Sequence, residues 1–250
     1  MKLRRWTLSR AAAAHLCVAA AALAIAAAAA GCSSGDEDVG RLAELLAVRP
    51  GSVVADVGAG RGAMTLVMAG LVGPRGRVYS TEIDPAALAQ IRSAARAAGL
   101  ANVVVVKATA SDTGLPARCC DAIFLSRVYH HLTDPADYNA SLLRALRPGG
   151  RLAVLDFRPT ILLWLWRPKG LPANREGHGV DPIIVSSEMT HAGFEYIRMI
   201  DPWPGSWFIS SYCLLFERPP QGPATASPAA PPAPASASGN AGAGAGTSAQ

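Results

Sequence analysis

Three glycines, Gly58, Gly60 and Gly62, occupy alternate positions in the segment VVADVGAGRG, directly after an apolar run that contains Asp56. Glycine permits a tight turn with positive φ, and it lets a ligand approach the backbone closely. A helix that begins at Gly62 would offer unpaired N–H groups to an anion. Glu82 follows the next apolar run and is placed to accept hydrogen bonds from both hydroxyls of a ribose. The pattern predicts a binding site for a nucleoside that carries an anionic group.

Two kinds of cofactor suit this predicted site. The glycines also satisfy the G-x-G-x-x-G/A pattern of dinucleotide binding, with Ala63 in the last position. Asp56 favours a different ligand, because an acid at the strand end can meet an ammonium group, which a dinucleotide lacks. S-adenosylmethionine has an ammonium group together with a carboxylate, a ribose and an adenine. Asp56 therefore favours S-adenosylmethionine over a dinucleotide as the ligand.

A second group of reactive side chains follows two later apolar runs. Tyr129, His130 and His131 come after the fourth run, and Asp156 ends the fifth. His130 is the best general base by residue type, because the unperturbed pKa of histidine is near neutral. The competing interpretation is that His130 only closes the turn into the next helix and that His131 begins it. The three histidines His130, His131 and His178 lack the spacing of metal ligands, so we expect no metal site.

The elements that must position these residues follow from hydrophobic periodicity. Strands are expected at residues 52–57, 77–81, 103–106, 121–125, 151–157, 194–200 and 208–216, and helices at 41–48, 62–72, 85–98, 135–146 and 185–192. Strands that alternate with helices, and that read as unbroken apolar runs, predict an α/β fold with a mostly parallel sheet covered on both faces. The short connection between the last two strands predicts an antiparallel hairpin at one edge. Ligands of such sheets bind beyond the carboxyl ends of the strands, where the strand order reverses.

The ends of the chain differ in composition from its centre. Residues 1–31 have a basic start and then an Ala-rich apolar run, which is typical of a signal peptide. Small residues precede Cys32, and this resembles the lipobox of bacterial lipoproteins, in which the cysteine is acylated. An ordinary cleaved signal or a simple helical anchor are the alternatives. We expect residues 32–38 to form a tether, 39–218 one domain, and 219–250, which are uncharged and rich in Ala, Pro, Gly and Ser, a disordered tail.

Charge and cysteine content exclude some partners and frameworks. The net charge is +5, but four of the 23 basic residues lie in residues 1–31, which leaves 19 basic against 18 acidic residues. A nearly neutral domain does not have the electrostatic footprint of a nucleic-acid-binding protein, so we expect no nucleic-acid partner. Beyond Cys32 only Cys119, Cys120 and Cys213 remain, an odd number that indicates no disulfide framework.

Five segments, in this order, resemble motifs of the class I S-adenosylmethionine-dependent methyltransferases: VVADVGAGRGAMT, GRVYSTEIDP, ATASDTGLP, CDAIFLSRVYHHLTDP and LLRALRPGGRLAVLDF. The resemblance covers nearly the whole predicted domain. It implies a Rossmann-like, seven-stranded sheet whose last strand is antiparallel, with S-adenosylmethionine as the cofactor. It also implies that Glu82 binds the ribose and that Asp112 faces the adenine amino group.

These observations predict methyl transfer to a small or lipid-like acceptor, with His130, Tyr129 and Asp156 as the catalytic candidates. The apolar residues 161–166, within the insert 158–182, suit a lid over an apolar substrate, a contact with lipid, or a loop packed on the sheet edge. A lipid-anchored binding protein without catalysis is the alternative function, and an NAD-dependent oxidoreductase is a weaker one. We expect an exported, membrane-anchored protein, or a cytoplasmic one if translation starts at a later codon.

Overall fold

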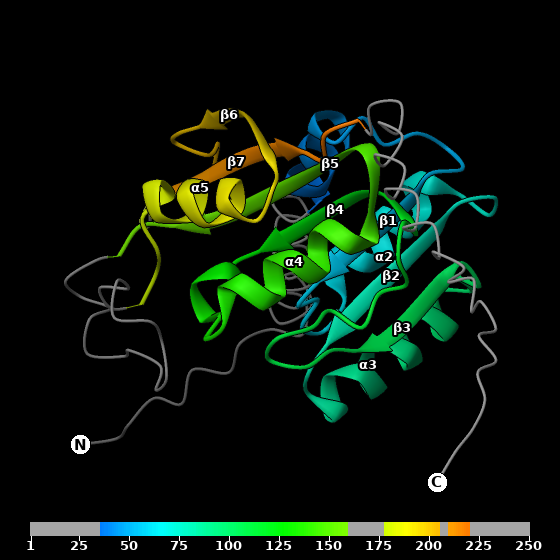
Figure 1. Ribbon diagram of the computed structural model, residues 1–250. Coiled ribbons are helices and arrows are strands. Elements are labelled where there is room, and N and C mark those ends of the chain that lie inside the picture. Colours follow the sequence, from blue (N-terminus) through cyan, green and yellow to red (C-terminus); the bar gives the residue numbers. More distant parts are fainter. Residues whose placement is uncertain (1–35, 160–177, 206–209, 221–250) are drawn as a thin grey trace, which may run out of the picture. The chain divides into compact units, whose positions relative to one another are not determined.

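The computed structural model describes residues 36–159, 178–205 and 210–220 (Figure 1). The chain divides into one compact unit of residues 1–220 and a second of residues 221–250, and the second lies wholly outside the described residues. The predicted signal segment, Cys32 and the apolar residues 161–166 also lie outside them. Among the helices that the structure does describe, none is long and apolar enough to cross a bilayer.

A seven-stranded sheet forms the centre of the first unit, with the strand order β3-β2-β1-β4-β5-β7-β6 (Figure 1). Strands β1 to β5 run parallel, and β7 runs antiparallel to both of its neighbours, β5 and β6. The prediction of a mostly parallel sheet with an antiparallel last strand is confirmed. The strands are β1 (Val53–Val57), β2 (Arg77–Glu82), β3 (Val103–Lys107), β4 (Cys120–Ser126), β5 (Leu146–Phe157), β6 (Glu195–Ile200) and β7 (Ser211–Glu217).

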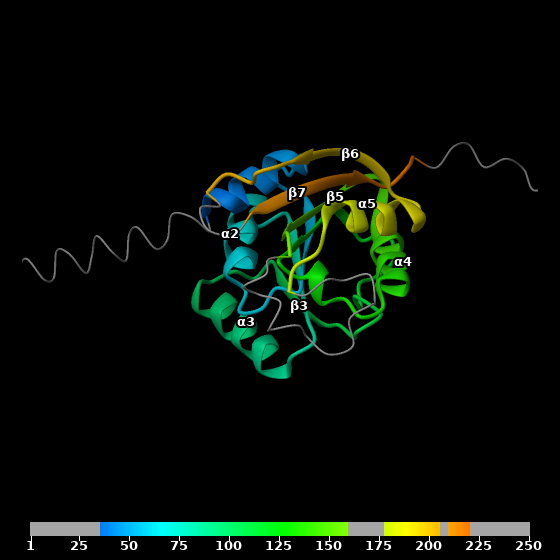
Figure 2. The same ribbon diagram turned by 90° about the vertical axis from the view of Figure 1, so that its left-hand side faces the viewer.

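Helices cover both faces of this sheet, as the unbroken apolar strands predicted. On one face, α4 and α5 pack against a cluster that includes Val57, Leu125 and Val154. On the other face, α2 and a helix at residues 36–45 pack against a cluster that includes Val54 and Phe124. Figure 2 shows α4 and α5 on one side of the sheet and α2 and α3 on the other. The helices are α2 (Ala63–Val72), α3 (Pro85–Ala97), α4 (Pro135–Ala145) and α5 (Pro182–His191), with a short 3₁₀ turn, η1 (Tyr129–His131).

The first helix corrects the predicted tether. Periodicity placed its start at residue 41, but the structure begins the helix at residue 36. The side chain of Asp38 accepts a 2.7 Å hydrogen bond from the indole Nε1 of Trp203, and Val39 is fully buried. Residues 36–38 therefore belong to the folded domain. Leucine spacing missed this turn of helix because the turn contains no leucine and because the hydrogen bond of Asp38 is made to a residue far along the chain.

The fifth strand also begins earlier than predicted. Pro148-Gly149-Gly150 favoured a turn before residue 151, but the strand extends from Leu146. Cys120 pairs with Leu146, and the register shifts before Ala122 pairs with Arg151. The extended backbone thus includes the irregular proline–glycine stretch.

The topology determines where a ligand site can lie. Strand β1 lies between β2 and β4, and the strand order reverses at this point. The chain therefore leaves β1 and β4 towards opposite sides of the sheet, and a crevice forms beyond their carboxyl ends.

Candidate active site

A cavity of about 410 Å³ lies at the carboxyl ends of the first four strands, where the switch in strand order predicts a ligand site. Its volume is in the range of small-molecule sites. Segments that follow β1, β2, β3 and β4 all contribute to it. The lining residues are Gly58, Glu82, Ile83, Ala108, Thr109, Ala110, Arg127, Val128, His131, Leu132, Thr133 and Tyr138.

The glycine loop has the conformation that the sequence required. Gly58, Gly60 and Gly62 have φ values of 72°, 54° and 83°, in the left-handed region that side chains disfavour. A Cβ atom at Gly58 would lie 2.6 Å from Cγ2 of Val128. A Cβ atom at Gly60 would meet nothing within 4 Å. Gly58 therefore allows close packing between two loops, while the backbone at Gly60 stays open to a ligand.

Glu82 connects this loop to the end of β2. Its Oε2 accepts a 2.9 Å hydrogen bond from the Gly60 N–H, and its Oε1 accepts one of 2.7 Å from the Ile83 N–H. Oε1 also accepts a 3.3 Å hydrogen bond from the Asp84 N–H, so of the roughly four lone-pair sites of the carboxylate, one on Oε2 is left for a ribose hydroxyl. Glu82 lines the cavity. The carboxylate therefore organises the loop and is available to a ribose in the same place.

Asp56 lies behind the cavity and not in its lining. Its side chain is 3% exposed, and its Oδ2 accepts a 2.6 Å hydrogen bond from the Thr65 hydroxyl, which also contacts the Ser80 hydroxyl at 2.9 Å. Burial, with a smaller contribution from the charge of Glu82, raises the pKa of Asp56 to about 7. Asp56 thus joins β1, β2 and α2 through its hydrogen bond with Thr65, and its contact with an ammonium group stays a prediction.

Asp112 is also directed away from the cavity. Its Oδ1 accepts a 2.7 Å hydrogen bond from the Gly114 N–H, and its Oδ2 forms a 2.7 Å ion pair with Arg144. The Gly114 N–H, and to a lesser extent Arg144, lower the pKa of the Asp112 carboxyl group. The residues after β3 that do line the cavity are Ala108, Thr109 and Ala110. The sequence located the right segment, but the structure does not bring the Asp112 carboxylate to the cavity.

His130 and Asp156 meet in the interior, at the ends of β4 and β5. Asp156 Oδ1 lies 2.8 Å from His130 Nδ1, and its Oδ2 accepts a 3.1 Å hydrogen bond from the His130 backbone N–H. Because a carboxylate only accepts, the Nδ1 of His130 is the donor and its Nε2 carries the lone pair. His130 is 1% exposed and Asp156 is fully buried. The pair is formed as a unit, but it lies behind the cavity lining.

Tyr129 points into the core. Its hydroxyl donates to Oε2 of Glu188 at 3.0 Å and accepts from Nδ2 of Asn139 at 2.7 Å. The ring is fully buried among the residues that α4 and α5 cover. Among the three predicted catalytic residues, Tyr129 is the one that the structure separates from the other two.

His131 reaches the cavity in place of His130, and His178 lies beside it. The ring centroids of His131 and His178 are 5.4 Å apart, and each lies within 4.6 Å of the His130 ring. Burial, then the neighbouring His130 and His178, lower the pKa of His131 to about 4. Burial and His130 also lower the pKa of His178. Both imidazoles are therefore neutral at pH 7. Sequence spacing missed the cluster because His178 is 47 residues beyond His131.

Several lining residues were not predicted from the sequence. Ile83, Val128 and Leu132 supply apolar walls, and Tyr138 comes from the first turn of α4. Arg127 has a φ of 57°, a left-handed conformation that is unusual for a residue with a side chain. The available signal was positional, since all but Tyr138 follow closely on a strand end.

Comparisons with known proteins agree with this geometry. The model of a methyltransferase domain matches residues 55–154. The ubiquinone/menaquinone biosynthesis C-methyltransferase UbiE of Ectopseudomonas mendocina is 37% identical over 115 residues, which are 46% of this chain and 45% of the relative. The corresponding protein of Vibrio cholerae is 36% identical over 115 residues, 46% of this chain and 44% of the relative. The matched part thus spans less than half the length of these curated relatives.

Solved structures share the fold. A SAM-dependent methyltransferase from Aquifex aeolicus aligns with a TM-score of 0.60 at 22% identity, over 72% of this chain and 89% of the other. A possible exported protein from Bordetella parapertussis aligns with a TM-score of 0.54 at 18% identity, over 73% of this chain and 67% of the other. The matched domain and the fold are both similar to those of the S-adenosylmethionine-dependent methyltransferases. Residues 55–154 match a methyltransferase domain, and S-adenosylmethionine is the cofactor that this match implies.

The described residues fit this cofactor. Glu82 provides the carboxylate for a diol, and the side-chain-free Gly60 gives access to the backbone. Ile83, Val128 and Leu132 provide apolar surfaces of the kind that cover a flat aromatic base. These features lie in one region, at the carboxyl ends of the strands. They are the hydrogen-bond acceptor for the diol, the open glycine loop and the apolar walls.

Proposed function

We propose that this protein transfers the methyl group of S-adenosylmethionine to a small, apolar or lipid-like acceptor. One observation carries the proposal: a single cavity contains Gly58 and Glu82, on the cofactor side, together with His131, Leu132 and Tyr138 from beyond β4. A cavity that joins the two sets can hold two molecules in contact. Val128 and Leu132 give this part of the cavity apolar walls, which supports an apolar acceptor.

Bound S-adenosylmethionine supplies an electrophilic methyl group and a neutral leaving group. The chain's own contribution is to orient and to exclude water. Glu82 holds the diol side, and Ile83, Val128 and Leu132 keep solvent from the reacting region. Holding two reactants in line accounts for a large part of the rate of such a transfer.

Proton removal by a histidine side chain contributes little in this proposal. The lowered pKa of His131, about 4, makes its ring a weak proton acceptor at neutral pH. His130 is almost completely buried, and its Nδ1 is held by Asp156. We therefore assign Asp156 and His130 to positioning of the turn η1, and we expect alignment of the acceptor to dominate.

The relatives support a lipid-like acceptor. They are named as C-methyltransferases of ubiquinone and menaquinone biosynthesis. The domain match at residues 55–154 contains every lining residue of the cavity, but the relatives match over less than half of their own length, so the acceptor class rests mainly on the apolar lining. A quinol-type ring is the first acceptor to test.

Binding and transfer can be tested separately by calorimetry and a radiolabel assay. We expect the purified chain to bind S-adenosylhomocysteine and not NAD, and to transfer labelled methyl groups from S-adenosylmethionine to a quinol-type acceptor. Tight NAD binding without S-adenosylhomocysteine binding would instead support an oxidoreductase. Binding of S-adenosylhomocysteine without transfer to any apolar acceptor would support a binding protein without catalysis.

We also propose that the protein is exported and anchored to a membrane through acylated Cys32. The basic start, the Ala-rich run and the small residues before Cys32 support this location. A possible exported protein is among the structures with this fold. Mass spectrometry of the native N-terminus tests the proposal. An acylated Cys32 that is lost in Cys32→Ala supports it, and a native N-terminus at Met1 or Val39 contradicts it.

A further inference from the structure

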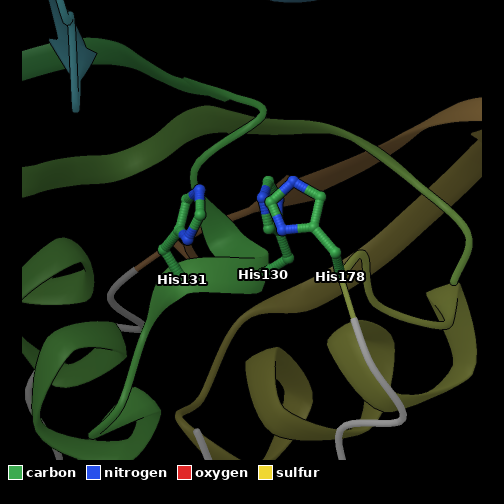
Figure 3. Close-up of side chains that lie close together, drawn as sticks. All are labelled: His130, His131 and His178. Carbon is green, nitrogen blue, oxygen red and sulfur yellow. The ribbon is translucent and has the colours of Figure 1, made fainter. Parts of the chain in front are cut away.

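Three histidines converge beside the cavity although they come from two separate segments. His130 and His131 belong to the turn η1, and His178 lies on the chain that leads into α5. One ring nitrogen from each lies within 4.8 Å of those of the other two. Figure 3 shows the three imidazole rings gathered in one place. The fold, and not the sequence spacing, creates this cluster.

Two nitrogens of the cluster are buried without a hydrogen bond. His130 Nε2 and His178 Nδ1 have no hydrogen-bond partner among the described residues. Buried polar atoms are nearly always paired, so unpaired ones call for an explanation. The phenyl ring of Phe157 packs 4.7 Å from the His130 ring and 5.4 Å from the His178 ring, which leaves an apolar wall and no polar partner on that side.

The orientation of His130 is that of a metal ligand. Asp156 holds Nδ1 at 2.8 Å, so Nε2 presents its lone pair towards the other two rings. A carboxylate on the far nitrogen of a histidine is the usual support for a metal-binding imidazole, because it fixes the tautomer and the ring orientation. Here the carboxylate is itself fully buried and is fixed by two backbone N–H groups, those of His130 and Phe157.

We propose that His130, His131 and His178 bind one divalent transition-metal ion of the zinc class, with Asp156 as the residue that positions His130. Nitrogen ligands at about 2.0–2.1 Å from a tetrahedral zinc ion lie roughly 3.3 Å apart. The present separations of up to 4.8 Å therefore close by rotation of the His131 and His178 side chains, while His130 stays fixed. Three imidazoles and one open position are the ligand set of a catalytic zinc site.

The metal site has a specific consequence for the acceptor, and this part rests on the proposed function. His131 lines the cavity, so the open position of the ion lies at the cavity edge. A zinc ion lowers the pKa of a hydroxyl or thiol that it binds. The site therefore selects acceptors with a hydroxyl or thiol group near the atom that is methylated.

Metal titration of the full-length chain tests the site directly. After treatment with a chelator, we expect one Zn²⁺ per chain by calorimetry, a Co²⁺ visible spectrum typical of tetrahedral coordination, and a higher Tm with Zn²⁺. His131→Ala and His178→Ala should each weaken Zn²⁺ binding by about 100-fold or more, and Asp156→Asn by about 10–100-fold. His191→Ala is the matched control, because His191 is an exposed histidine outside the cluster and should bind Zn²⁺ as the wild type does.

Circular dichroism and Tm without metal establish that each variant folds. The proposal is overturned if folded wild-type protein fails to bind Zn²⁺ at micromolar concentrations. It is also overturned if His131→Ala and His178→Ala bind the ion as tightly as His191→Ala does. Calorimetry with S-adenosylhomocysteine on metal-free protein keeps the two proposals separate: cofactor binding without Zn²⁺ binding removes only the metal site, and Zn²⁺ binding without cofactor binding removes only the methyltransferase activity.

Discussion

The substitution Asp56→Asn tests the electrostatics behind the glycine loop. Burial raises the pKa of the Asp56 carboxyl group to about 7 in the folded protein, from an ordinary value of 3.8. Between these two values the folded state binds more protons than the unfolded state, so the free energy of unfolding falls as the pH rises. A difference of about three pKa units, at 1.36 kcal/mol each, corresponds to roughly 4 kcal/mol lost between pH 4 and pH 8.

The asparagine variant removes this titration but keeps the shape of the side chain. We expect a cost of about 1 kcal/mol at pH 4, where the wild-type carboxyl group is neutral, for the altered hydrogen bond with Thr65. At pH 8 the variant should be more stable than the wild type by roughly 3 kcal/mol, because no charge is buried. The variant and the wild type are compared without bound cofactor.

Urea unfolding at several pH values between 4 and 8 measures the free energy of unfolding of the variant and of the wild type. The contributions of the other titrating groups cancel in the difference between the two. Thr65→Val is a useful companion, because the Thr65 hydroxyl lowers the pKa of Asp56, and its loss should raise that pKa and extend the fall in stability to higher pH. A stability difference that stays constant across the whole pH range would refute the assignment of a buried, mostly desolvated carboxyl group.

Three further outcomes are expected. Glu82→Ala should weaken S-adenosylhomocysteine binding by about 1.5–3 kcal/mol in calorimetry, since a charged acceptor and the anchor of the Gly60 N–H are lost together; unchanged affinity would remove Glu82 from the site. Gly58→Ala should destabilise the fold by about 1–3 kcal/mol in urea unfolding, because its Cβ would lie 2.6 Å from the Val128 side chain at a positive φ, whereas wild-type stability would show that the loop can move aside. Tyr129→Phe should cost about 1 kcal/mol of stability and leave cofactor affinity unchanged, and a loss of affinity would return Tyr129 to the site.

Most of the fold could be read from the sequence because its central strands are buried on both faces. Continuous apolar runs such as AIFL in β4 have no amphipathic interpretation, and glycines and prolines mark nearly every strand and helix end. The predicted start of the first helix is wrong because a polar contact between distant residues determines it. The first helix begins at residue 36, and Asp38 in its first turn accepts a hydrogen bond from Trp203. Hydrophobic periodicity does not reveal a partner that lies 165 residues away.

The candidate site was predictable to the level of segments and less so to the level of side chains. Of the residues predicted to bind a cofactor, Gly58 and Glu82 line the cavity. The directions of the Asp56 and Asp112 side chains could not be predicted, because each depends on a hydrogen-bond partner from another element, Thr65 and Arg144. The meeting of His178 with the turn η1 depends on how the chain returns after β5, which spacing does not encode.

The place of β7 in the sheet has a consequence for the order in which the chain can fold during synthesis. Among the described residues this strand is the last in the sequence, yet it lies between β5 and β6 and is hydrogen-bonded to both. When only the residues up to 210 have left the ribosome, β7 is absent from the sheet. The backbone groups of β5 and β6 that pair with β7 are then unpaired. Open strand edges pair readily with those of other chains. The ribosome must release the final strand before the sheet can close, and a product truncated ahead of Ser211 should aggregate rather than fold.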